Sequence, residues 1–379
     1  MVRSIKVRLY PTKQQCQRFR EHIGASRYIW NWAIDIQKQN HIENLPHIKS
    51  FDIIRKLPVL KHDGFHDWLN DISNATLQHA CVDLEHAYTR FFRKVAGYPQ
   101  YKSKKQGSQN FALDSYRTFF KDSVFVQIPS IGLVKYKCDK KLPIGKEHHF
   151  KDPRILLKKD KWILVVAVDV EKQNVNLTDT VMGIDLGVKN TITAVCGTYQ
   201  KKFPNINKSK KIRNLLRKES QIQIRLSRKY RQNKTGNIYH KTGNIKKYEK
   251  KVRNIRSKIS NIRSNYNHQI TAELIKLKPR KIVMEDLNIL GMMKNRYLAK
   301  AVQSQCFSQI IHHIRYKSEN YGIEFVQANR FFPSSRLCRN CGCVNKKLTL
   351  ADRIFICPEC GYKIDRDYNA AFNLIEYKT

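Results

Sequence analysis

Two closely spaced cysteine pairs restrict the local fold more than any other feature of the sequence. They are Cys338 with Cys341 and Cys357 with Cys360, each with two residues between its members. Two such pairs separated by a short loop are typical of a zinc ribbon, in which four thiolates hold one structural Zn²⁺ in a closed tetrahedral site. We therefore predict a zinc ribbon over residues 331–361 with these four ligands. Chance clustering or a disulfide pair is the alternative.

The other cysteines are consistent with this chemistry. Five of the ten cysteines lie in this short segment, which predicts metal binding in a reducing compartment rather than a secreted disulfide framework. Gly342 and Gly361 each directly follow a ligand pair, where backbone amides must turn toward sulfur. Cys343 is a spare cysteine that could compete as a ligand. Its spacing from Cys341 is not the usual one, so we expect the site to form without it.

The chain is strongly basic. Its 72 lysines and arginines outnumber its 31 aspartates and glutamates, which gives a formal net charge of +41. Such a charge is self-repulsive unless a polyanion neutralises it, and nucleic acid is the obvious polyanion. A membrane-surface protein is the weaker alternative, because the charge is spread through segments with folded patterns. We find no apolar run of ~18 residues that could span a membrane and no signal-peptide core at the N-terminus.

The first half of the chain predicts a β module interrupted by helices. With 379 residues and 41% hydrophobic content, the chain is long enough for two or more modules with real cores. The alternation in MVRSIKVRLY predicts an opening strand, and Thr12 with Gln15 predicts a capping box that starts a helix. Helical patterns continue to about residue 95, and strand-like runs return over residues 111–170. Helices are therefore expected as an insertion after the first strand.

The second half predicts an α/β module. Strand-like runs occur at residues 181–185, 191–196, 281–284 and 323–327, followed by the cysteine cluster and a short final helix. Residues 204–265 form a long basic stretch whose apolar residues recur at spacings of three and four. With a glycine-containing turn at residues 234–243, this stretch predicts an antiparallel helical hairpin.

Three acidic residues stand out in a chain that is short of acid. Asp185 and Glu285 each end an apolar strand, and Asp367 stands at the start of the last helix. A carboxylate at the end of a buried strand is costly unless something pairs with it, and a divalent metal ion would do so. Two adjacent Mg²⁺ ions that share carboxylates can activate water and stabilise the leaving oxygen in phosphodiester cleavage. The order strand-Asp, strand-Glu, helix-Asp therefore predicts a metal-dependent nuclease site.

Each acid also has a simpler interpretation. Asp367 could be only the N-cap of the last helix, a position that Asp favours. Asp185 could be a turn residue before Gly187, and Asp286 rather than Glu285 could be the relevant acid. Taken singly, the residues leave these alternatives open.

Several motifs follow one another along the chain. They are Gly183-Ile-Asp-Leu-Gly187, Val283-Met-Glu-Asp-Leu-Asn288, Pro333-Ser-Ser-Arg-Leu-Cys338, the four cysteines and Asp365-Arg-Asp-Tyr-Asn-Ala-Ala371, with weaker matches at Trp68-Leu-Asn-Asp71 and Gly97-Tyr-Pro-Gln-Tyr-Lys102. In these motifs the chain resembles TnpB, a family of accessory proteins of bacterial insertion sequences that is related to the type V CRISPR effectors. The resemblance covers essentially the whole chain and is more specific in its second half.

The resemblance implies an α/β multidomain fold. An RNase H-like (RuvC) nuclease domain with an inserted zinc ribbon would be joined to a wedge β-barrel with an inserted helical recognition domain. The implied ranges are 1–12 and 111–176 for the wedge barrel, 13–110 for the helical recognition domain, 177–330 and 362–379 for the nuclease with its basic hairpin at 204–265, and 331–361 for the zinc ribbon.

The resemblance also implies a function. It implies a transposon-encoded, RNA-guided endonuclease that cleaves double-stranded DNA matched to a guide RNA next to a short motif. Asp185, Glu285 and Asp367 would be the catalytic triad and would hold Mg²⁺ or Mn²⁺. Asp367 is chosen over Asp365 because the second Asp of the Asp-x-Asp-x-Asn pattern is the family's catalytic one. Guide RNA and target DNA would be the partners, without a membrane, and a transposase would be only a genetic neighbour. The expected location is the bacterial cytoplasm, with action at the nucleoid.

Nucleic-acid contacts are predicted at two places. The basic hairpin carries charges of nearly one sign, which favours contact with a phosphate backbone; its candidate residues are Lys210, Lys211, Arg217, Lys247 and Lys251. Helical residues between Trp68 and Cys81, including Thr76 and Gln78, are candidates for reading the DNA motif beside the target. An inert solvated surface is the alternative for both sets.

Three rival functions remain to be distinguished. The first is an RNA-guided repressor that binds DNA without cleaving it, against which the intact triad argues. The second is a transposase, which would not require guide RNA for its activity. The third is a guide-independent RuvC-like nuclease for branched DNA, which the basic excess and the added helical domain make less favourable.

Overall fold

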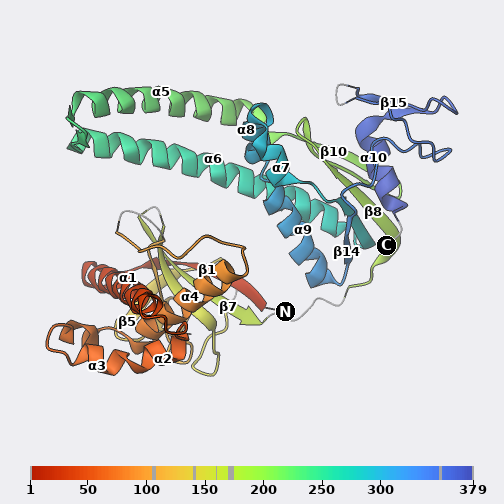
Figure 1. Cartoon of the computed structure of the whole chain (residues 1–379). Coiled ribbons are helices and arrows are strands. Elements are labelled where there is room, and N and C mark those ends of the chain that lie inside the picture. The colour runs from red at the N-terminus through yellow and green to blue at the C-terminus, as the bar shows by residue number, and fades with distance from the viewer. Residues whose placement is uncertain are drawn as a thin grey trace. The chain divides into compact units, whose positions relative to one another are not determined.

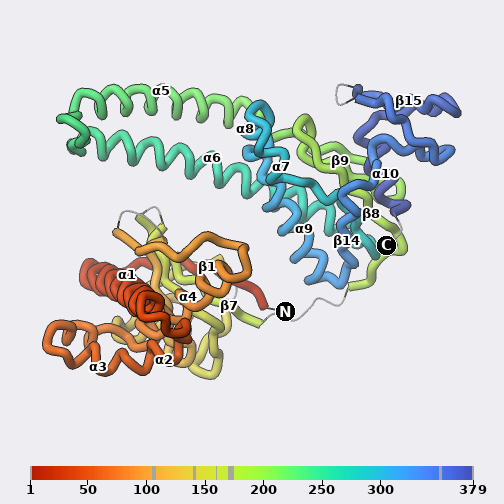
Figure 2. The backbone as a smooth tube through the Cα atoms, viewed as in Figure 1, coloured from red at the N-terminus to blue at the C-terminus, as the bar shows by residue number. Residues whose placement is uncertain are grey.

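The computed structural model describes residues 2–104, 108–139, 142–158, 160–169, 175–349 and 352–377. The chain divides into two compact units, Met1–Val170 and Glu171–Thr379. Their elements are shown in Figure 1 and the course of the backbone in Figure 2. Each unit has its own sheet and its own hydrophobic core. None of the described helices is both long and apolar enough to cross a membrane.

The first unit contains a seven-stranded antiparallel sheet with the order β2-β6-β7-β1-β5-β4-β3. The strands are β1 (Val2–Tyr10), β2 (Asn110–Ala112), β3 (Phe119–Phe120), β4 (Phe125–Ile128), β5 (Gly132–Lys137), β6 (Lys151–Lys158) and β7 (Lys161–Asp169). The opening strand lies in the middle of the sheet, and its alternate residues Val7 and Leu9 are buried with Phe111 and Leu164. Strand pairing runs from β2 at one edge to β3 at the other, so closure into a wedge barrel stays a prediction.

Helices occupy the chain between β1 and β2, as predicted. They are α1 (Lys13–Ile42), α2 (Ser50–Arg55), α3 (Leu57–Lys61), the 3₁₀ helix η1 (Asp67–Asp71) and α4 (Asn74–Phe92). The predicted capping box is confirmed, because the Gln15 amide donates to Oγ1 of Thr12 at 3.2 Å and the Thr12 amide donates to the Gln15 side chain at 3.0 Å. α1 and α4 pack through a core of their own that includes Ile29, Ala33 and Leu84.

The second unit contains a five-stranded mixed sheet with the order β10-β9-β8-β13-β14. The strands are β8 (Thr178–Leu186), β9 (Asn190–Cys196), β10 (Tyr199–Pro204), β13 (Pro279–Glu285) and β14 (Glu324–Ala328). β8, β9 and β10 are antiparallel neighbours, whereas β13 runs parallel to both β8 and β14. Because parallel strands share a direction, the carboxyl ends of β8, β13 and β14 lie at the same edge of the sheet.

Helices lie on both faces of this sheet. The helices of the unit are η2 (Ile206–Lys208), α5 (Lys210–Gln232), α6 (Gly243–Lys276), α7 (Ile289–Lys294), α8 (Arg296–Gln305), α9 (Phe307–Tyr321) and α10 (Arg366–Ile375). Two small strand pairs accompany them, β11 (Lys234–Thr235) with β12 (Ile238–Tyr239) and β15 (Ile354–Ile356) with β16 (Lys363–Asp365). α6 and α9 pack on one face, where Met182 and Ile184 of β8 meet Leu274 and Ile310. α10 packs on the other face, against β8.

α5 and α6 form the predicted antiparallel hairpin. The two helices lie side by side (Figure 1). The strand pair β11–β12 forms the connection between them. Leu226 of α5 and Ile245 and Val252 of α6 form a small apolar core between them. The apolar residues at spacings of three and four therefore mark the helix–helix contact, and the remaining positions are left to the basic side chains.

The contact between α10 and β8 leaves room only for glycine at position 183. A Cβ atom on Gly183 would lie 1.8 Å from the carbonyl oxygen of Ala371 and 3.1 Å from Cγ1 of Ile375. The first obstacle is helix backbone, which can yield only if α10 moves as a whole. Gly183 therefore sets how closely the last helix approaches the sheet.

We expect Gly183→Ala to destabilise the second unit by about 1–3 kcal/mol, the usual range for overpacking an interior. The physical reason is that α10 has to shift away from β8 to accept the methyl group. Urea unfolding of the full chain measures the effect. Gly243→Ala is the matched control, because nothing lies near its Cβ position at the start of α6, and it should change stability by less than about 0.5 kcal/mol. Equal stability of the two variants would contradict the close contact.

Candidate functional site

Two of the candidate acids end neighbouring parallel strands. The described register of β8 and β13 ends with Ile184 beside Met284, and Asp185 and Glu285 are the next residue on each strand. Successive strand residues alternate between faces, so Asp185 shares its face with Gly183, which lies under α10. The two carboxylates therefore lie at the carboxyl edge of the sheet, on the α10 side.

α10 brings the third acid to the same place. The backbone at Ala371 is the part of the helix that meets Gly183, and Asp367 stands four residues earlier on the same side of the helix. The side chain of Asn190, at the start of β9, donates to Oδ2 of Asp367 at 3.4 Å. The three carboxylates thus come together from β8, β13 and α10.

The grouped carboxylates repel one another where water is scarce. Burial raises the pKa of Asp185 well above its ordinary value, and the charges of Glu285 and Asp367 raise it further. Burial also raises the pKa of Glu285, against the opposing effect of Arg366. Lys202 and Arg366 lower the Asp185 pKa without restoring it to the ordinary value. Carboxylates in such a state gain free energy from a bound cation.

Lys202 links the acids of the last helix to the sheet. Its ammonium group, on β10, donates to Oδ1 of Asp365 at 2.5 Å and lies 3.5 Å from Oδ2 of Asp367. The same Asp365 oxygen accepts the amides of Asp367 and Tyr368 at 3.0 and 3.3 Å, so Asp365 is the N-cap of α10. Burial acts to raise the pKa of Asp365, but these hydrogen bonds hold it below its usual value. Because Asp365 is the N-cap of α10, the interpretation of Asp367 as the N-cap is wrong.

Asp286 has a different partner from Glu285. Its carboxylate accepts a hydrogen bond at 2.9 Å from Arg330, in the loop after β14. Glu285 is the residue of this pair whose charge raises the pKa of Asp185. The geometry therefore favours Glu285 over Asp286 as the second acid of the group.

The carboxylate group suits hard divalent cations. Carboxylate oxygens are the preferred ligands of Mg²⁺ and are also suited to Mn²⁺. Among the residues that the structure describes, the four cysteines are the one set of three or more ligand groups tight enough to share a single ion. The three carboxylates are spread more widely, which is compatible with two ions about 3.5–4 Å apart.

The four predicted zinc ligands lie together. The sulfur atoms of Cys338, Cys341, Cys357 and Cys360 are all within 4.8 Å of one another. The Cys338–Cys360 and Cys341–Cys357 sulfur distances are 3.7 and 3.5 Å. A tetrahedral site with Zn–S bonds of about 2.3 Å needs sulfurs at roughly such separations. Because a disulfide bond is only about 2.05 Å long, the disulfide alternative is wrong.

The backbone around the sulfurs favours thiolates. Gly342 and Gly361 have φ angles of 74° and 69°, as expected where the chain turns sharply after a ligand pair. The amide of Cys360 approaches the sulfur of Cys357 at 3.5 Å. A backbone hydrogen bond is the main cause that lowers the pKa of Cys360 to about 6. Cys343 lies outside the group of four sulfur atoms that are within 4.8 Å of one another, so the geometry leaves it out of the ligand set.

The ribbon connects directly to the helix of the third acid. β16 ends at the N-cap of α10, without an intervening loop. The side chains of Asn369 and Asn373 on α10 donate to the carbonyl oxygen of Leu337 at 2.8 and 2.7 Å, and Asn373 also donates to the Ser334 carbonyl at 2.7 Å. The ribbon therefore holds α10 at its start and along one side.

Comparison with known proteins gives agreeing matches along the chain. Family models match residues 1–45 ("Helix-turn-helix domain"), 164–296 ("Probable transposase") and 307–374 ("Cas12f1-like, TNB domain"). A Streptomyces pristinaespiralis protein named "Putative RNA-guided DNA endonuclease" is 26% identical over 381 residues, covering 98% of this chain and 88% of that protein. "TnpB-like protein L79" of Acanthamoeba polyphaga mimivirus is 23% identical over 420 residues, covering 99% of this chain and 73% of that protein.

These matches support the TnpB resemblance: the chain is similar to RNA-guided endonuclease and TnpB-like proteins along almost its whole length. Its fold is also similar to that of a solved protein of the related Cas12f1 group, determined as a Cas12f1–sgRNA–target DNA complex. That similarity has a TM-score of 0.58 at 14% sequence identity and covers 99% of this chain and 98% of the other. Together the matches confirm the resemblance to TnpB seen in the sequence motifs.

The basic hairpin presents its charge to solvent. Its two acids are used internally, since Arg256 pairs with Glu219 at 2.6 Å and Lys241 with Glu249 at 2.7 Å. The five predicted contact residues are all exposed: Lys210, Lys211, Arg217, Lys247 and Lys251. The hairpin surface is therefore available to a polyanion.

The two motif-reading candidates on α4 differ in their surroundings. Thr76 is 1% exposed, and its hydroxyl donates to the carbonyl of Ala112 on β2 at 2.8 Å. This buried position corrects the prediction of Thr76 as a surface contact; the residue falls on the helix face that holds Leu77 and Ala80. Gln78 is exposed, and its role in DNA contact stays a prediction.

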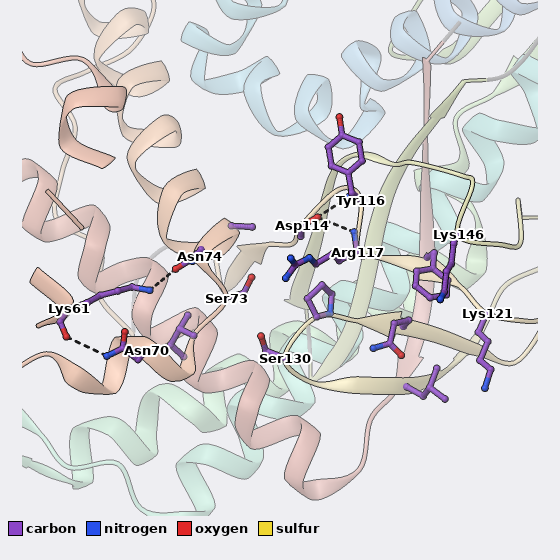
Figure 3. A pocket seen from close by; sticks show the side chains of 16 residues that line it. Lys61, Asn70, Ser73, Asn74, Asp114, Tyr116, Arg117, Lys121, Ser130 and Lys146 are labelled. Atoms are coloured by element: carbon purple, nitrogen blue, oxygen red, sulfur yellow. Dashed lines mark hydrogen bonds between the residues drawn. The ribbon is translucent and has the colours of Figure 1, made fainter. Parts of the chain in front are cut away.

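A cleft of about 990 Å³ lies within the first unit, at the start of α4. Figure 3 shows its labelled polar lining: Lys61, Asn70, Ser73 and Asn74 from the helices, and Asp114, Tyr116, Arg117, Lys121, Ser130 and Lys146 from the strands and their loops. Asp114 is the one acid among the lining residues, and its carboxylate already accepts the Arg117 amide at 2.9 Å. Cations with neighbouring amide and hydroxyl groups suit an anionic ligand that also offers hydrogen-bonding edges.

The sequence analysis did not predict the cations beside the candidate carboxylates, Lys202 and Arg366, or the cations that line the cleft of the first unit. Lys202 follows directly from alternation on β10, because Phe203 is buried in the sheet core and its neighbour must face the other side. Arg366 lies between the two aspartates of the last motif, and no spacing in the sequence signals that its charge acts on Asp185. The cleft residues come from positions as far apart as Lys61 and Lys146, so no local pattern could have united them.

Zinc content tests the ribbon. Cys357→Ser should lose most of the bound zinc and lower the unfolding temperature of the second unit, because one thiolate of a closed site is removed. Elemental analysis of the purified full chain measures the metal. Cys343→Ser is the matched control and should retain one zinc per chain, because its sulfur lies outside the cluster. Zinc loss in Cys343→Ser with retention in Cys357→Ser would refute the ligand assignment.

Proposed function

We propose that the protein is a transposon-encoded, RNA-guided endonuclease that cleaves double-stranded DNA matched to a guide RNA beside a short motif. The convergence of Asp185, Glu285 and Asp367 at one sheet edge carries the proposal, in a chain that resembles TnpB and has a relative with an endonuclease name. The exposed cations of the α5–α6 hairpin supply independent support for a nucleic-acid partner.

The candidate triad would hold two Mg²⁺ or Mn²⁺ ions. Such ions supply an activated water and neutralise the leaving oxygen of the phosphodiester. The chain's own residues prepare the place. Asp365 fixes the start of α10, and Lys202 holds both Asp365 and Asp367 in position. Asp185 is half-buried, and a carboxylate with less water around it attracts a cation more strongly.

The second unit is assigned as an RNase H-like (RuvC) nuclease domain. Three antiparallel strands followed by two parallel strands support this assignment, as does the placement of acids on β8, β13 and the final helix. The ribbon is assigned as a structural zinc insertion in that domain. The antiparallel sheet of the first unit, with its helices inserted after β1, supports a wedge domain with a helical recognition insertion.

The recognition roles divide between two surfaces. The basic hairpin would contact the backbone of the guide RNA or its heteroduplex, leaving sequence to base pairing. The polar cleft of the first unit would receive the duplex beside the target. Its amides at Asn70 and Asn74 and its cations at Arg117 and Lys121 can serve base edges and phosphates, respectively.

A transposase is the second candidate function. The family model that matches residues 164–296 is described as "Probable transposase", which is the observation in its favour. Dependence on guide RNA distinguishes the two candidates. A nuclease of the proposed kind cuts only DNA that pairs with the guide, whereas a transposase acts on transposon ends without one.

Amide substitutions test the triad. Asp185→Asn, Glu285→Gln and Asp367→Asn should each lower the cleavage rate by roughly a thousandfold, since several kcal/mol of transition-state stabilisation are lost. DNA binding should stay intact, because base pairing and cationic surface do not depend on these acids. Gel electrophoresis of matched DNA with Mg²⁺ and guide RNA measures cleavage, and a gel shift measures binding.

Asp365→Asn is the matched control within the same motif. Asparagine caps helices as well as aspartate does, so α10 should keep its start and cleavage should fall by less than about tenfold. Loss of cleavage in Asp365→Asn with full activity in Asp367→Asn would show that the third acid is misassigned. Unchanged cleavage in all three triad variants would refute the proposed site.

Salt dependence tests the hairpin. The logarithm of RNA affinity should fall linearly with the logarithm of salt concentration, with about 0.7–0.9 of slope for each phosphate neutralised. Changing Lys210, Lys211, Arg217, Lys247 and Lys251 together to Gln should flatten the slope by that amount for each residue that contacts a phosphate. A filter-binding series over salt concentration measures it. Exposed lysines of the first unit, such as Lys13 and Lys56, changed to Gln provide the control, and an equal effect in both variants would contradict a specific hairpin contact.

A further inference from the structure

An aromatic ring stands exposed beside the candidate site. The side chain of Phe331 is 88% exposed. It follows β14 by three residues, and the last residue of that strand, Ala328, pairs with Glu285 in the parallel register of β13 and β14. The loop that carries the ring therefore leaves the sheet at the edge where the candidate acids gather.

The backbone on both sides of this ring is anchored. The Asn329 amide donates to the hydroxyl of Tyr377 at 3.1 Å, and the Asn329 side chain accepts the amide of the exposed phenylalanine at 2.9 Å. Arg330 donates to Asp286 at 2.9 Å, which ties the loop to the residue after the second candidate acid. Phe332 packs edge-on against Tyr377, with ring centroids 5.0 Å apart. Phe331 is thus presented to solvent by a fixed loop.

The surroundings of the ring suit a nucleobase. Single-stranded nucleic acid is bound where aromatic rings for stacking alternate with cations for phosphates. The neighbouring Arg330 has a side chain that is 49% exposed, and the whole chain carries a net charge of +41. Because the loop is already ordered, stacking on the ring costs little conformational entropy. Neighbouring Phe332 cannot share this role, since it lies in the small core with Val283 and Leu374.

We propose that Phe331 is a stacking platform for an unpaired base of the DNA strand that approaches the candidate carboxylates. This inference rests on the proposed function, which requires one DNA strand to be separated from its partner before it is cut. Stacking on a ring tolerates any base, as an enzyme directed by base pairing elsewhere needs. The platform would hold the strand so that its backbone, and not its bases, faces Asp185 and Glu285.

Photochemical crosslinking locates the contact without relying on cleavage. The full chain, in buffer with Ca²⁺ in place of Mg²⁺, is irradiated with a single-stranded deoxyoligonucleotide that contains 5-iodouracil. A base stacked on an aromatic ring is well placed to form a covalent adduct with it. Trypsin cleaves after Arg330 and Arg336, so mass spectrometry should find the adduct on the peptide 331–336, at Phe331.

Variants at Phe331 distinguish the effect of ring stacking from the effect of side-chain size. Phe331→Trp should keep the adduct and the oligonucleotide affinity. Phe331→Leu should lose the adduct and weaken binding by about tenfold, with the same slope against salt, because ring stacking and not charge is removed. Phe65→Ala is the matched control, since Phe65 is 85% exposed in the first unit, and it should change neither quantity.

Several results would overturn the proposal. These are no adduct on the peptide in the wild-type chain, equal adduct yields for Phe331→Leu and wild type, or an unfolding temperature several degrees lower in Phe331→Leu, which would mean that the ring packs against protein. The proposed function fails separately. If the wild-type chain forms the adduct but does not cut guide-matched DNA, the stacking proposal stands and the endonuclease proposal fails. If it cuts such DNA without forming the adduct, the stacking proposal fails and the endonuclease proposal stands.

Discussion

The candidate site depends on the close contact between α10 and β8. Because Gly183 has no side chain, the carbonyl of Ala371 can occupy the space beside it. The helix therefore approaches the strand closely enough to bring Asp367 beside Asp185. Any larger residue at Gly183 would move the helix and the third carboxylate together. Gly183 of the Gly-Ile-Asp-Leu-Gly motif therefore sets the position of α10 relative to Asp185, two residues later. The motif combines a packing residue with a candidate metal ligand.

The site also resolves a conflict of charges. A chain with a net charge of +41 attracts phosphate backbones, yet its candidate acids would repel them. Lys202 and Arg366 lower the cost of grouping the carboxylates but leave the pKa of Asp185 raised. Only further positive charge brings the acids and a phosphate together, which is the physical reason for assigning divalent ions to the site. Glu219 and Glu249 present no such conflict, because cations within the hairpin pair with both.

Much of this arrangement could be predicted from the sequence. The zinc cysteines, the capping box at Thr12 and the basic hairpin follow from local spacing, and the structure has all three. The convergence of acids was predicted only as a pattern of strand ends, because register and the α10 contact are long-range features. Thr76 failed for a local reason, since the period that places Leu77 and Ala80 in the core also buries Thr76. The cleft of the first unit depends on residues brought together by tertiary packing, which no short motif carries.

The zinc ribbon has more than a stabilising part in this arrangement. Its four cysteines lie in the chain between Phe331 and α10, and the segments before and after them are both attached to that helix. At its start, the carbonyls of Ser334 and Leu337 accept hydrogen bonds from Asn373. At its end, β16 stops at Asp365, the N-cap that fixes the helix start. Thiolate ligation of a zinc ion would therefore help to fix where the helix of Asp367 begins, and this structural metal would act on the candidate site by positioning one of its carboxylates.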